Sequence, residues 1–382
     1  MGEGCKSANE LTVATTAKAS NALRLVVFLG LSALAASPSA HAVDPNRKIS
    51  QYGHAAWRIQ DGAIAPGTTI AQTTDGYIWL GTPEGLMRFD GVTFTRWQPP
   101  KEQSLLGAHF TALFGSRDGS LWIGTTKGLS RWQNGQLRVY SDPTKPFGVG
   151  TIIEDRSGTI WFTRYLSQDR TGPLCSISQD TFRCFGKDDG IPASYGLGLT
   201  QDGAGDLWFA SRVLYRWRHG SSAIAFFSDI EEKLAAKAAG VVDVAAAPDG
   251  TVWATLDGTG PELGVRYYTG GKWASYIVPG FDGQKIWSHA LLLDREGSLW
   301  VGTENDGIYG IHGGVADHYT TSDGLSGNAI VLFYEDHEGN IWVRTNGVSK
   351  HTDYHLHHAA RPFHRRSTIR PCLARRVGLG CR

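Results

Sequence analysis

The chain has few residues of several kinds, and these shortages exclude several classes of protein. It has two methionines and five cysteines among 382 residues, so we expect neither a methionine-rich surface nor a dense disulfide framework. Charged residues make up 19% of the chain, and the net charge is +1. Between residues 43 and 350 acidic residues outnumber basic ones. We therefore expect no nucleic-acid partner, because neutralising phosphates requires a basic surface.

Sequence patterns of catalysis and cofactor binding are also missing. The chain contains no His-Glu-x-x-His, no Gly-x-Ser-x-Gly, no phosphate loop, no dinucleotide fingerprint and no Asp-x-Asp-x-Asp-Gly calcium loop. We therefore expect no enzyme activity, no cofactor and no metal site. After residue 43 no apolar run is long enough to span a membrane.

The longest apolar segment, Leu25 to Ala36, lies near the N-terminus and follows the basic residue Arg24. As a helix it would rise only ~18 Å, which is shorter than the ~30 Å hydrocarbon core of a bilayer. The small residues of Ala40-His41-Ala42 then form a cleavage site. We predict that residues 1–42 are a signal peptide and that the mature chain is periplasmic; an uncleaved anchor is the alternative.

Glycine (48 residues) and tryptophan (13 residues) are abundant, and they recur in one phrase. The phrase reads acidic residue, glycine, any residue, aliphatic, tryptophan, aliphatic, glycine, threonine, as in residues 75–82 and 118–125. Its spacing of about forty to fifty residues is typical of propeller blades or of helical repeats. Strong and weak copies centre on Trp79, Trp122, Trp161, Trp208, Trp253, Trp300 and Trp342.

Composition favours the propeller. The segments are short, alternate apolar with polar residues and are separated by Asp-Gly and Asn-Gly turns. The first repeat is interpreted as strands at 68–73, 77–82, 85–89 and 92–97. The sequence therefore predicts an all-β fold, a seven-bladed β-propeller of four-stranded antiparallel blades within residues 43–350. The repeated tryptophan is expected to pack between blades and not to catalyse.

The seventh repeat indicates how the ring closes. Strands are expected near 330–335, at 340–345 and at 347–350, but no convincing outer strand follows. Residues 52–60, with Trp57 four residues before an Asp-Gly turn, match the outer strands of other repeats. We therefore predict that this N-terminal strand completes the seventh blade.

Residues 351–382 have a different composition, with five histidines, seven arginines and one acidic residue. Three interpretations stay open: a frameshifted or truncated gene, a basic tail that binds anionic lipid or polysaccharide, and a disordered terminus. All three place this tail outside the propeller. His355, His357 and His358 could hold a metal, but a biased tail explains them equally well.

Residues 70–94, IAQTTDGYIWLGTPEGLMRFDGVTF, closely resemble the two-component regulator propeller repeat. Residues 52–62, YGHAAWRIQDG, resemble the usual start of that region. The resemblance implies the periplasmic ligand-sensing region of bacterial sensor histidine kinases and related signalling proteins. Such proteins usually add a second propeller, an immunoglobulin-like domain, a transmembrane helix and kinase domains. No phosphoacceptor histidine box or ATP lid is found here, so we expect a sensor truncated before its membrane and kinase parts.

One irregular loop position predicts where a ligand binds. Between the outer strand of one blade and the inner strand of the next, His109, Tyr195 and Trp287 are large and can form hydrogen bonds. The equivalent residues of other blades are small or apolar, namely Pro66, Gly148, Gly240 and Ala329. Arg164 and Asp306, from loops between second and third strands, complete the predicted site. Aromatic rings beside charged groups suit a small polar molecule or glycan; loop residues that bind only water are the alternative.

Two cysteines lie in the predicted propeller. Cys175 and Cys184 fall on the third and fourth strands of blade three, where a hairpin would place them opposite each other. In an oxidising periplasm we predict a disulfide, with two buried free thiols as the alternative.

The function predicted from the sequence is therefore ligand sensing without chemistry. Two alternatives are a propeller lyase similar to virginiamycin B lyase, with His109 or His289 as its base, and a protein-binding scaffold. The sequence leaves homodimerisation open.

The export prediction can be tested on its own. When the full chain is expressed in a Gram-negative bacterium that exports through the Sec pathway, the periplasmic product should begin at Val43, because the signal peptidase cuts after Ala-x-Ala. N-terminal sequencing reads this directly. An intact N-terminus in the membrane fraction would instead support the uncleaved anchor.

Overall fold

The computed structural model describes residues 48–57, 69–140, 145–165, 171–231, 240–346 and 354–358. The predicted signal peptide, the predicted third strand at 347–350 and most of the tail lie outside these residues. All of these residues belong to the compact unit that spans residues 42–382.

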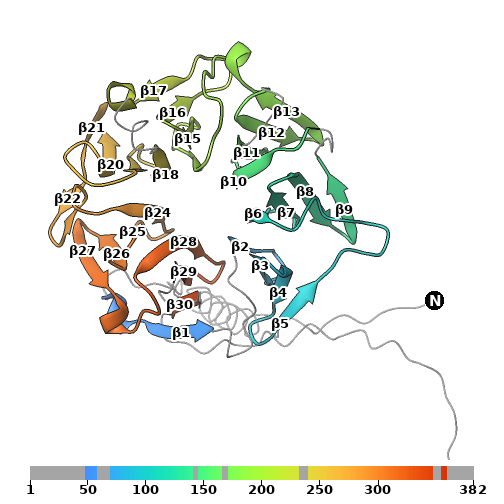
Figure 1. Cartoon of the computed structure of the whole chain (residues 1–382), viewed down its shortest axis with the longest axis horizontal. Helices are drawn as coiled ribbons and strands as arrows, with labels where there is room; N and C mark the ends of the chain where they lie inside the picture. The colour runs from blue at the N-terminus through green and yellow to red at the C-terminus, as the bar shows by residue number, and fades with distance from the viewer. Residues whose placement is uncertain are drawn as a thin grey trace, which may run out of the picture. The chain divides into compact units, whose positions relative to one another are not determined.

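The described residues form seven four-stranded antiparallel sheets, numbered here from 1 to 7 along the chain (Figure 1). Sheet 1 holds β2 (Thr69–Gln72), β3 (Ile78–Thr82), β4 (Gly85–Phe89) and β5 (Phe94–Trp97). Sheet 2 holds β6 (Phe110–Gly115), β7 (Leu121–Thr125), β8 (Gly128–Gln133) and β9 (Gln136–Val139). Sheet 3 holds β10 (Gly148–Glu154), β11 (Ile160–Tyr165), β12 (Leu174–Ser178) and β13 (Thr181–Phe185). Sheet 4 holds β14 (Leu199–Gln201), β15 (Leu207–Ala210), β16 (Leu214–Trp217) and β17 (Ile224–Phe226).

The remaining sheets follow the same plan. Sheet 5 holds β18 (Val241–Ala246), β19 (Val252–Leu256), β20 (Gly264–Thr269) and β21 (Lys272–Ser275). Sheet 6 holds β24 (Ser288–Leu293), β25 (Leu299–Thr303), β26 (Ile308–His312) and β27 (Val315–Tyr319). Between them lies a short hairpin, β22 (Ile277–Val278) and β23 (Phe281–Asp282). Single 3₁₀ turns occur at η1 (Ile49–Gln51), η3 (Lys187–Asp189), η4 (Ser228–Ile230) and η5 (Thr321–Asp323).

Sheet 7 is built from both ends of the described chain. Its order is β1 (Gly53–Trp57), β30 (Tyr354–His358), β29 (Ile341–Asn346) and β28 (Ala329–Glu335). β1 pairs antiparallel with β30, from Gly53 opposite His358 to Trp57 opposite Tyr354. The third strand of this sheet therefore comes from the segment that we interpreted as a tail. That interpretation is wrong for residues 354–358, because β29 leaves an edge to which these residues supply the backbone partners.

Each second strand carries its tryptophan into the space between two sheets. Trp300, for example, packs with Phe333 and Ile330 of sheet 7. Seven apolar clusters arise in this way, one between each pair of successive sheets, and the last joins sheet 7 to sheet 1 through Trp342 and Phe89. The core thus lies between the sheets, as we expected from the repeated tryptophan.

A carboxylate in the preceding turn orients four of the seven indoles; three of these carboxylates are buried, and Asp155 is half-buried. In sheet 6 the indole N–H of Trp300 donates to Asp294, six residues earlier in the turn, at 2.8 Å. The same bond links Trp161 to Asp155, Trp208 to Asp202 and Trp342 to Asp336. In sheet 1 Thr73 takes this role for Trp79. The repeated phrase does not include Thr73, because it begins at the acidic residue two positions later.

The glycine of the repeated phrase allows neighbouring sheets to approach closely. A Cβ atom at Gly81 would lie 2.6 Å from Cβ of Phe110 in sheet 2. At Gly302 it would lie 2.6 Å from the Ile330 side chain in sheet 7. At these two positions only glycine fits, because the second strand lies against a side chain of the innermost strand of the next sheet.

Polar contacts also join sheet 7 to sheet 1. The backbone N–H of Gln72 donates to the Tyr334 hydroxyl at 2.8 Å. The side-chain nitrogen Nε2 of Gln72 donates to the Glu338 carboxylate at 2.9 Å. The N–H of His337 donates back to the Gln72 amide oxygen at 2.6 Å. One glutamine thus connects the first sheet to the last.

The role of β30 makes a truncation informative. A chain that ends at Lys350 loses β30, so β1 loses its backbone partner and β29 becomes an exposed edge. Several ladder hydrogen bonds, each worth about 1 kcal/mol, should be lost, lowering the thermal midpoint by roughly 5 °C or more. A chain that ends at His358 keeps β30 and is the matched control. Equal melting of all three chains would show that β30 contributes nothing to the fold.

Candidate functional site

In each antiparallel sheet, the loop between the second and third strands lies at the same end as the loop that leads from the outermost strand to the next sheet. We call this end the connecting-loop face. It carries every residue of the predicted ligand site except Arg164. A repeated backbone bond shows that His109 and Trp287 hold equivalent positions. The residue that follows the second strand donates its N–H to the carbonyl before the innermost strand, as Thr126 does to His109 and Glu304 does to Trp287.

Trp287 is held in a fixed orientation although it is exposed. Its indole N–H donates to the Asp257 carboxylate at 2.6 Å, and its carbonyl accepts the N–H of Glu304 at 2.9 Å. Among the tryptophans whose side chains the structure describes, Trp287 alone is exposed, at 43%. Because Asp257 follows β19 and Glu304 follows β25, two sheets together set the position of this ring.

His289 lies beside this tryptophan. It falls at an irregularity in β24, where the pairing register shifts between Ser288 and Ala290. Its Nδ1 is 3.4 Å from a carboxylate oxygen of Glu304, and its ring meets the Trp287 indole edge to face at a centroid distance of 5.7 Å. The other ring nitrogen, Nε2, is buried without a hydrogen-bond partner. Asp257, Trp287, His289 and Glu304 are called the Trp287 site below.

The other predicted residues are not joined to this site. His109 is exposed and Tyr195 is half-buried, and they belong to the loops that enter sheets 2 and 4. Asp306 follows Glu304 by two residues but turns outward, where it accepts a hydrogen bond from the Tyr309 hydroxyl at 2.7 Å. His318 stacks on that tyrosine. Within the described residues no contact joins His109 or Tyr195 to Trp287.

Arg164 is not a loop residue, so its predicted placement is wrong. It lies in β11, only 1% exposed, with its guanidinium carbon 4.3 Å from the ring centre of Phe147. One guanidinium nitrogen donates to Thr171 at 2.7 Å and approaches the Cys184 sulfur at 3.1 Å. Counting residues from the turn located the strand end correctly to within one residue, but the side chain points into the sheet interface.

The structure joins Cys175 and Cys184 by a disulfide between β12 and β13, where the two residues are directly opposite. Cys175 is fully buried. The Arg164 guanidinium covers this bond from the β11 side, so the disulfide and the arginine form one packed unit inside sheet 3.

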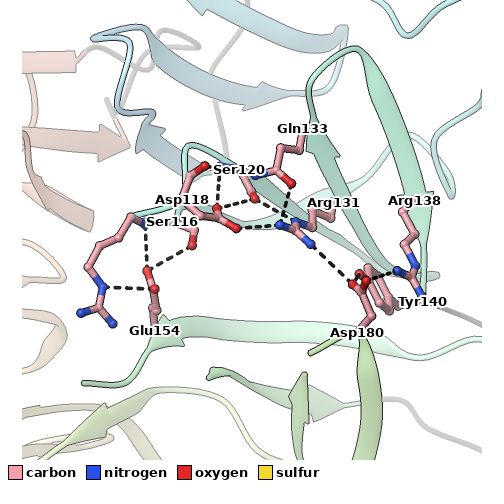
Figure 2. Close-up of polar contacts among 10 residues, drawn as sticks. Ser116, Asp118, Ser120, Arg131, Gln133, Arg138, Tyr140, Glu154 and Asp180 are labelled. Carbon is pink, nitrogen blue, oxygen red and sulfur yellow. Dashed lines mark hydrogen bonds and ion pairs between the residues drawn. The ribbon is translucent and has the colours of Figure 1, made fainter. Parts of the chain in front are cut away.

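A second polar cluster lies at the opposite ends of the sheets and holds sheet 2 against sheet 3 (Figure 2). Asp180, in the turn between β12 and β13, accepts a hydrogen bond from Tyr140 at 3.0 Å and pairs with Arg138 at 2.6 Å. Arg131 reaches Asp180 at 3.5 Å and Asp118 at 2.6 Å. The hydrogen bond from Tyr140 is the main cause that holds the pKa of Asp180 below its usual value. Every charge in this cluster has a protein partner, so we assign it to packing.

Among the described carboxylates, Asp243 has the pKa that departs most from its ordinary value. Its two oxygens accept the N–H groups of Leu291 and Val244, both at 2.9 Å, and so connect β18 to β24. Thr69 makes the equivalent bond from sheet 1 to Leu113 with a neutral hydroxyl. Burial raises the pKa of Asp243 to about 6 despite these hydrogen bonds. Sequence reasoning missed Asp243, because nothing in the repeat distinguishes it from a turn aspartate.

No group of three or more histidine, cysteine or acidic side chains in the described part of the chain is arranged to hold a metal ion. Of the described helices, none has both the length and the apolar composition that a membrane crossing requires.

Comparisons with known proteins identify the repeats. The sequence profile of the family described as two component regulator propeller matches residues 280–305 and 324–347, which include β25 and β29. The chain carries two-component regulator propeller repeats. No curated protein sequence is significantly similar to the chain.

Solved structures agree with these repeats in fold. The extracellular domain of a hybrid two component system from B. thetaiotaomicron has a TM-score of 0.61 at 17% identity, covering 80% of this chain and 42% of that one. The extracellular domain of a one component system from the same organism has a TM-score of 0.57 at 17% identity, covering 77% and 38%. The chain thus spans about two fifths of these structures. Inactive virginiamycin B lyase from Staphylococcus aureus, with quinupristin, has a TM-score of 0.59 at 17% identity, covering 80% and 99%. The fold is therefore a β-propeller.

Asp243 gives a testable dependence of stability on pH. Its pKa of about 6 in the folded protein is above the value of ~3.9 expected after unfolding, so its contribution to stability is complete below pH ~4 and is lost as pH rises through 6. Asp243→Asn keeps an acceptor for Leu291 without the charge. Relative to wild type, this variant should gain about 1–3 kcal/mol of unfolding free energy between pH 4 and pH 7.5.

Denaturant melts of both proteins at several pH values measure this difference. Asp249→Asn, in the exposed turn of the same sheet, is the control and should leave the pH profile unchanged. A constant difference between the Asp243 variant and wild type across this pH range would contradict the raised pKa.

Proposed function

We propose that this propeller is the exported ligand-sensing domain of a two-component signalling system, and that it binds a small polar molecule or glycan without chemical conversion. The family repeats and the extracellular domains of similar fold support the signalling context. The observation that carries the proposal is the Trp287 site, where an exposed indole is held in place by its own N–H and carbonyl. A pre-oriented exposed aromatic ring is the usual anchor of a binding site.

We further propose that the seven sheets form one complete seven-bladed ring closed by the N-terminal strand β1. The pairing of β1 with β30, the core between sheets 7 and 1, and the Gln72 contacts support this closure. A closed ring holds the connecting-loop face rigid, so a ligand would meet a preformed surface and not one that must fold around it.

The Trp287 site can be tested once a ligand is found by thermal-shift screening of glycans and small metabolites. Trp287→Ala should weaken binding by about 2 kcal/mol or more, because it removes the anchor ring. Its thermal midpoint should stay near that of wild type, since the ring is outside the sheet interfaces. Trp300→Ala is the contrasting variant and should lose ~3–5 kcal/mol of stability through a core cavity. Calorimetry and thermal melting measure both quantities; unchanged binding by the Trp287 variant would place the ligand elsewhere.

A lyase is a second candidate function, and the pair of His289 with Glu304 favours it. A histidine 3.4 Å from a carboxylate can act as a general base whose orientation that carboxylate sets. The fold is also that of virginiamycin B lyase. Incubation with quinupristin, followed by chromatography, tests this candidate. Conversion that disappears in His289→Ala would support a lyase, and an unchanged substrate would exclude this reaction.

A further inference from the structure

The two carboxylates of the Trp287 site occupy one position in successive repeats. Asp257 and Glu304 each follow the tryptophan of their second strand by four residues. The other five repeats have a neutral or basic residue there: Pro83, Thr126, Tyr165, Arg212 and Asn346. Acidic residues are therefore confined at this position to sheets 5 and 6, on either side of Trp287. The repeat alone does not require them, because the backbone bond made at this position needs no particular side chain.

Within the described residues these two carboxylates have one basic neighbour, the His289 imidazole, whose Nδ1 lies 3.4 Å from Glu304. On the opposite face arginines pair with buried Asp206 and with half-buried Glu154 and Glu335. Among the described residues, no lysine or arginine forms an ion pair with Asp257 or Glu304. Lys285, the nearest lysine or arginine in sequence to Trp287, pairs with Asp282 at 3.0 Å.

The charge of the Trp287 site is therefore negative in either state of His289. Two carboxylates carry −2 between them, and a protonated imidazole beside Glu304 would reduce this only to −1. A neutral ligand that covered these groups would remove water from them without compensating the charge, which is unfavourable. A cation placed over the exposed indole would instead meet both carboxylates and the negative face of the ring.

We propose that the Trp287 site binds its ligand through a positively charged ammonium group, as in an amino sugar or another small amine. This inference rests on the proposed ligand-binding function and specifies the chemical class of the ligand. The ammonium lies over the Trp287 ring, and the carboxylates of Asp257 and Glu304 supply the opposite charge. The N–H of the indole is already used by Asp257, so the ring offers its face and not its polar edge.

Choline and its uncharged carbon analogue 3,3-dimethyl-1-butanol are suitable probes, because they have nearly the same shape and differ in charge. In calorimetric or NMR titrations of the mature chain, choline should bind saturably and at least about tenfold more tightly than the analogue. Glucosamine oligomers compared with their N-acetylated forms repeat this test on sugars. Preference for the charged form in both pairs indicates an ammonium site, and preference in the sugar pair alone restricts it to amino sugars.

Charge-neutral variants locate the site. Asp257→Asn still accepts the indole hydrogen bond, and Glu304→Gln keeps the shape of its side chain. The double variant should lose about tenfold or more of the affinity for choline and leave binding of the neutral analogue unchanged. Asp188→Asn, an exposed carboxylate in η3, removes a charge at another place and is the matched control.

Three outcomes would overturn the ammonium proposal: no saturable binding of either charged probe, equal affinity for charged and neutral probes, or equal loss in the double variant and in the control. The ammonium proposal can fail while the proposed ligand-sensing function stands. If Trp287→Ala abolishes binding of a neutral ligand found by screening while the charge variants bind it normally, the sensing site stands and the ammonium proposal is wrong.

Discussion

The hydrogen bond from the indole of the second strand to the carboxylate six residues earlier is the interaction on which four of the seven sheets depend. In sheet 6 it joins Trp300 to Asp294, and both side chains are buried. An unpaired carboxylate or indole N–H would be costly at that depth, so the turn must take the conformation that brings the two together. The turn then sets the register of the first two strands, and the indole face is left to pack on the next sheet. Four sheets repeat this unit, and sheet 1 replaces the carboxylate with the Thr73 hydroxyl.

Much of the fold could be predicted from the sequence because this unit has a short and local pattern. The tryptophan phrase located all seven second strands, and its glycine and aromatic residues indicated sheets packed face to face. The third strand of sheet 7 could not be predicted, because β30 is only five residues long and lies in a segment rich in histidine and arginine, whose composition differs from that of the repeats. Its position is set by the free edge of β29, which is a property of the assembled sheet and not of residues 354–358 themselves.

The candidate site was predictable in part. Trp287 departs from the small residues at equivalent loop positions, and that irregularity is visible in the sequence. Arg164 was placed wrongly, because counting along the chain gives a strand end but not the direction of its side chain. Asp257 was missed although it shares its repeat position with Glu304. Alignment of the repeats on the tryptophan, followed by comparison of charge at each column, would have found it.

The pairing of β1 with β30 joins segments that are about 300 residues apart in sequence, and this has a kinetic consequence. Contacts of such long range form late, because the chain between them must already be ordered before closing the loop becomes favourable. During synthesis β1 emerges first and its partner last, so sheet 7 cannot form until nearly the whole chain is available. The proposed export agrees with this order of assembly, since a final sheet that forms last leaves the chain unfolded until both of its ends are in the same compartment.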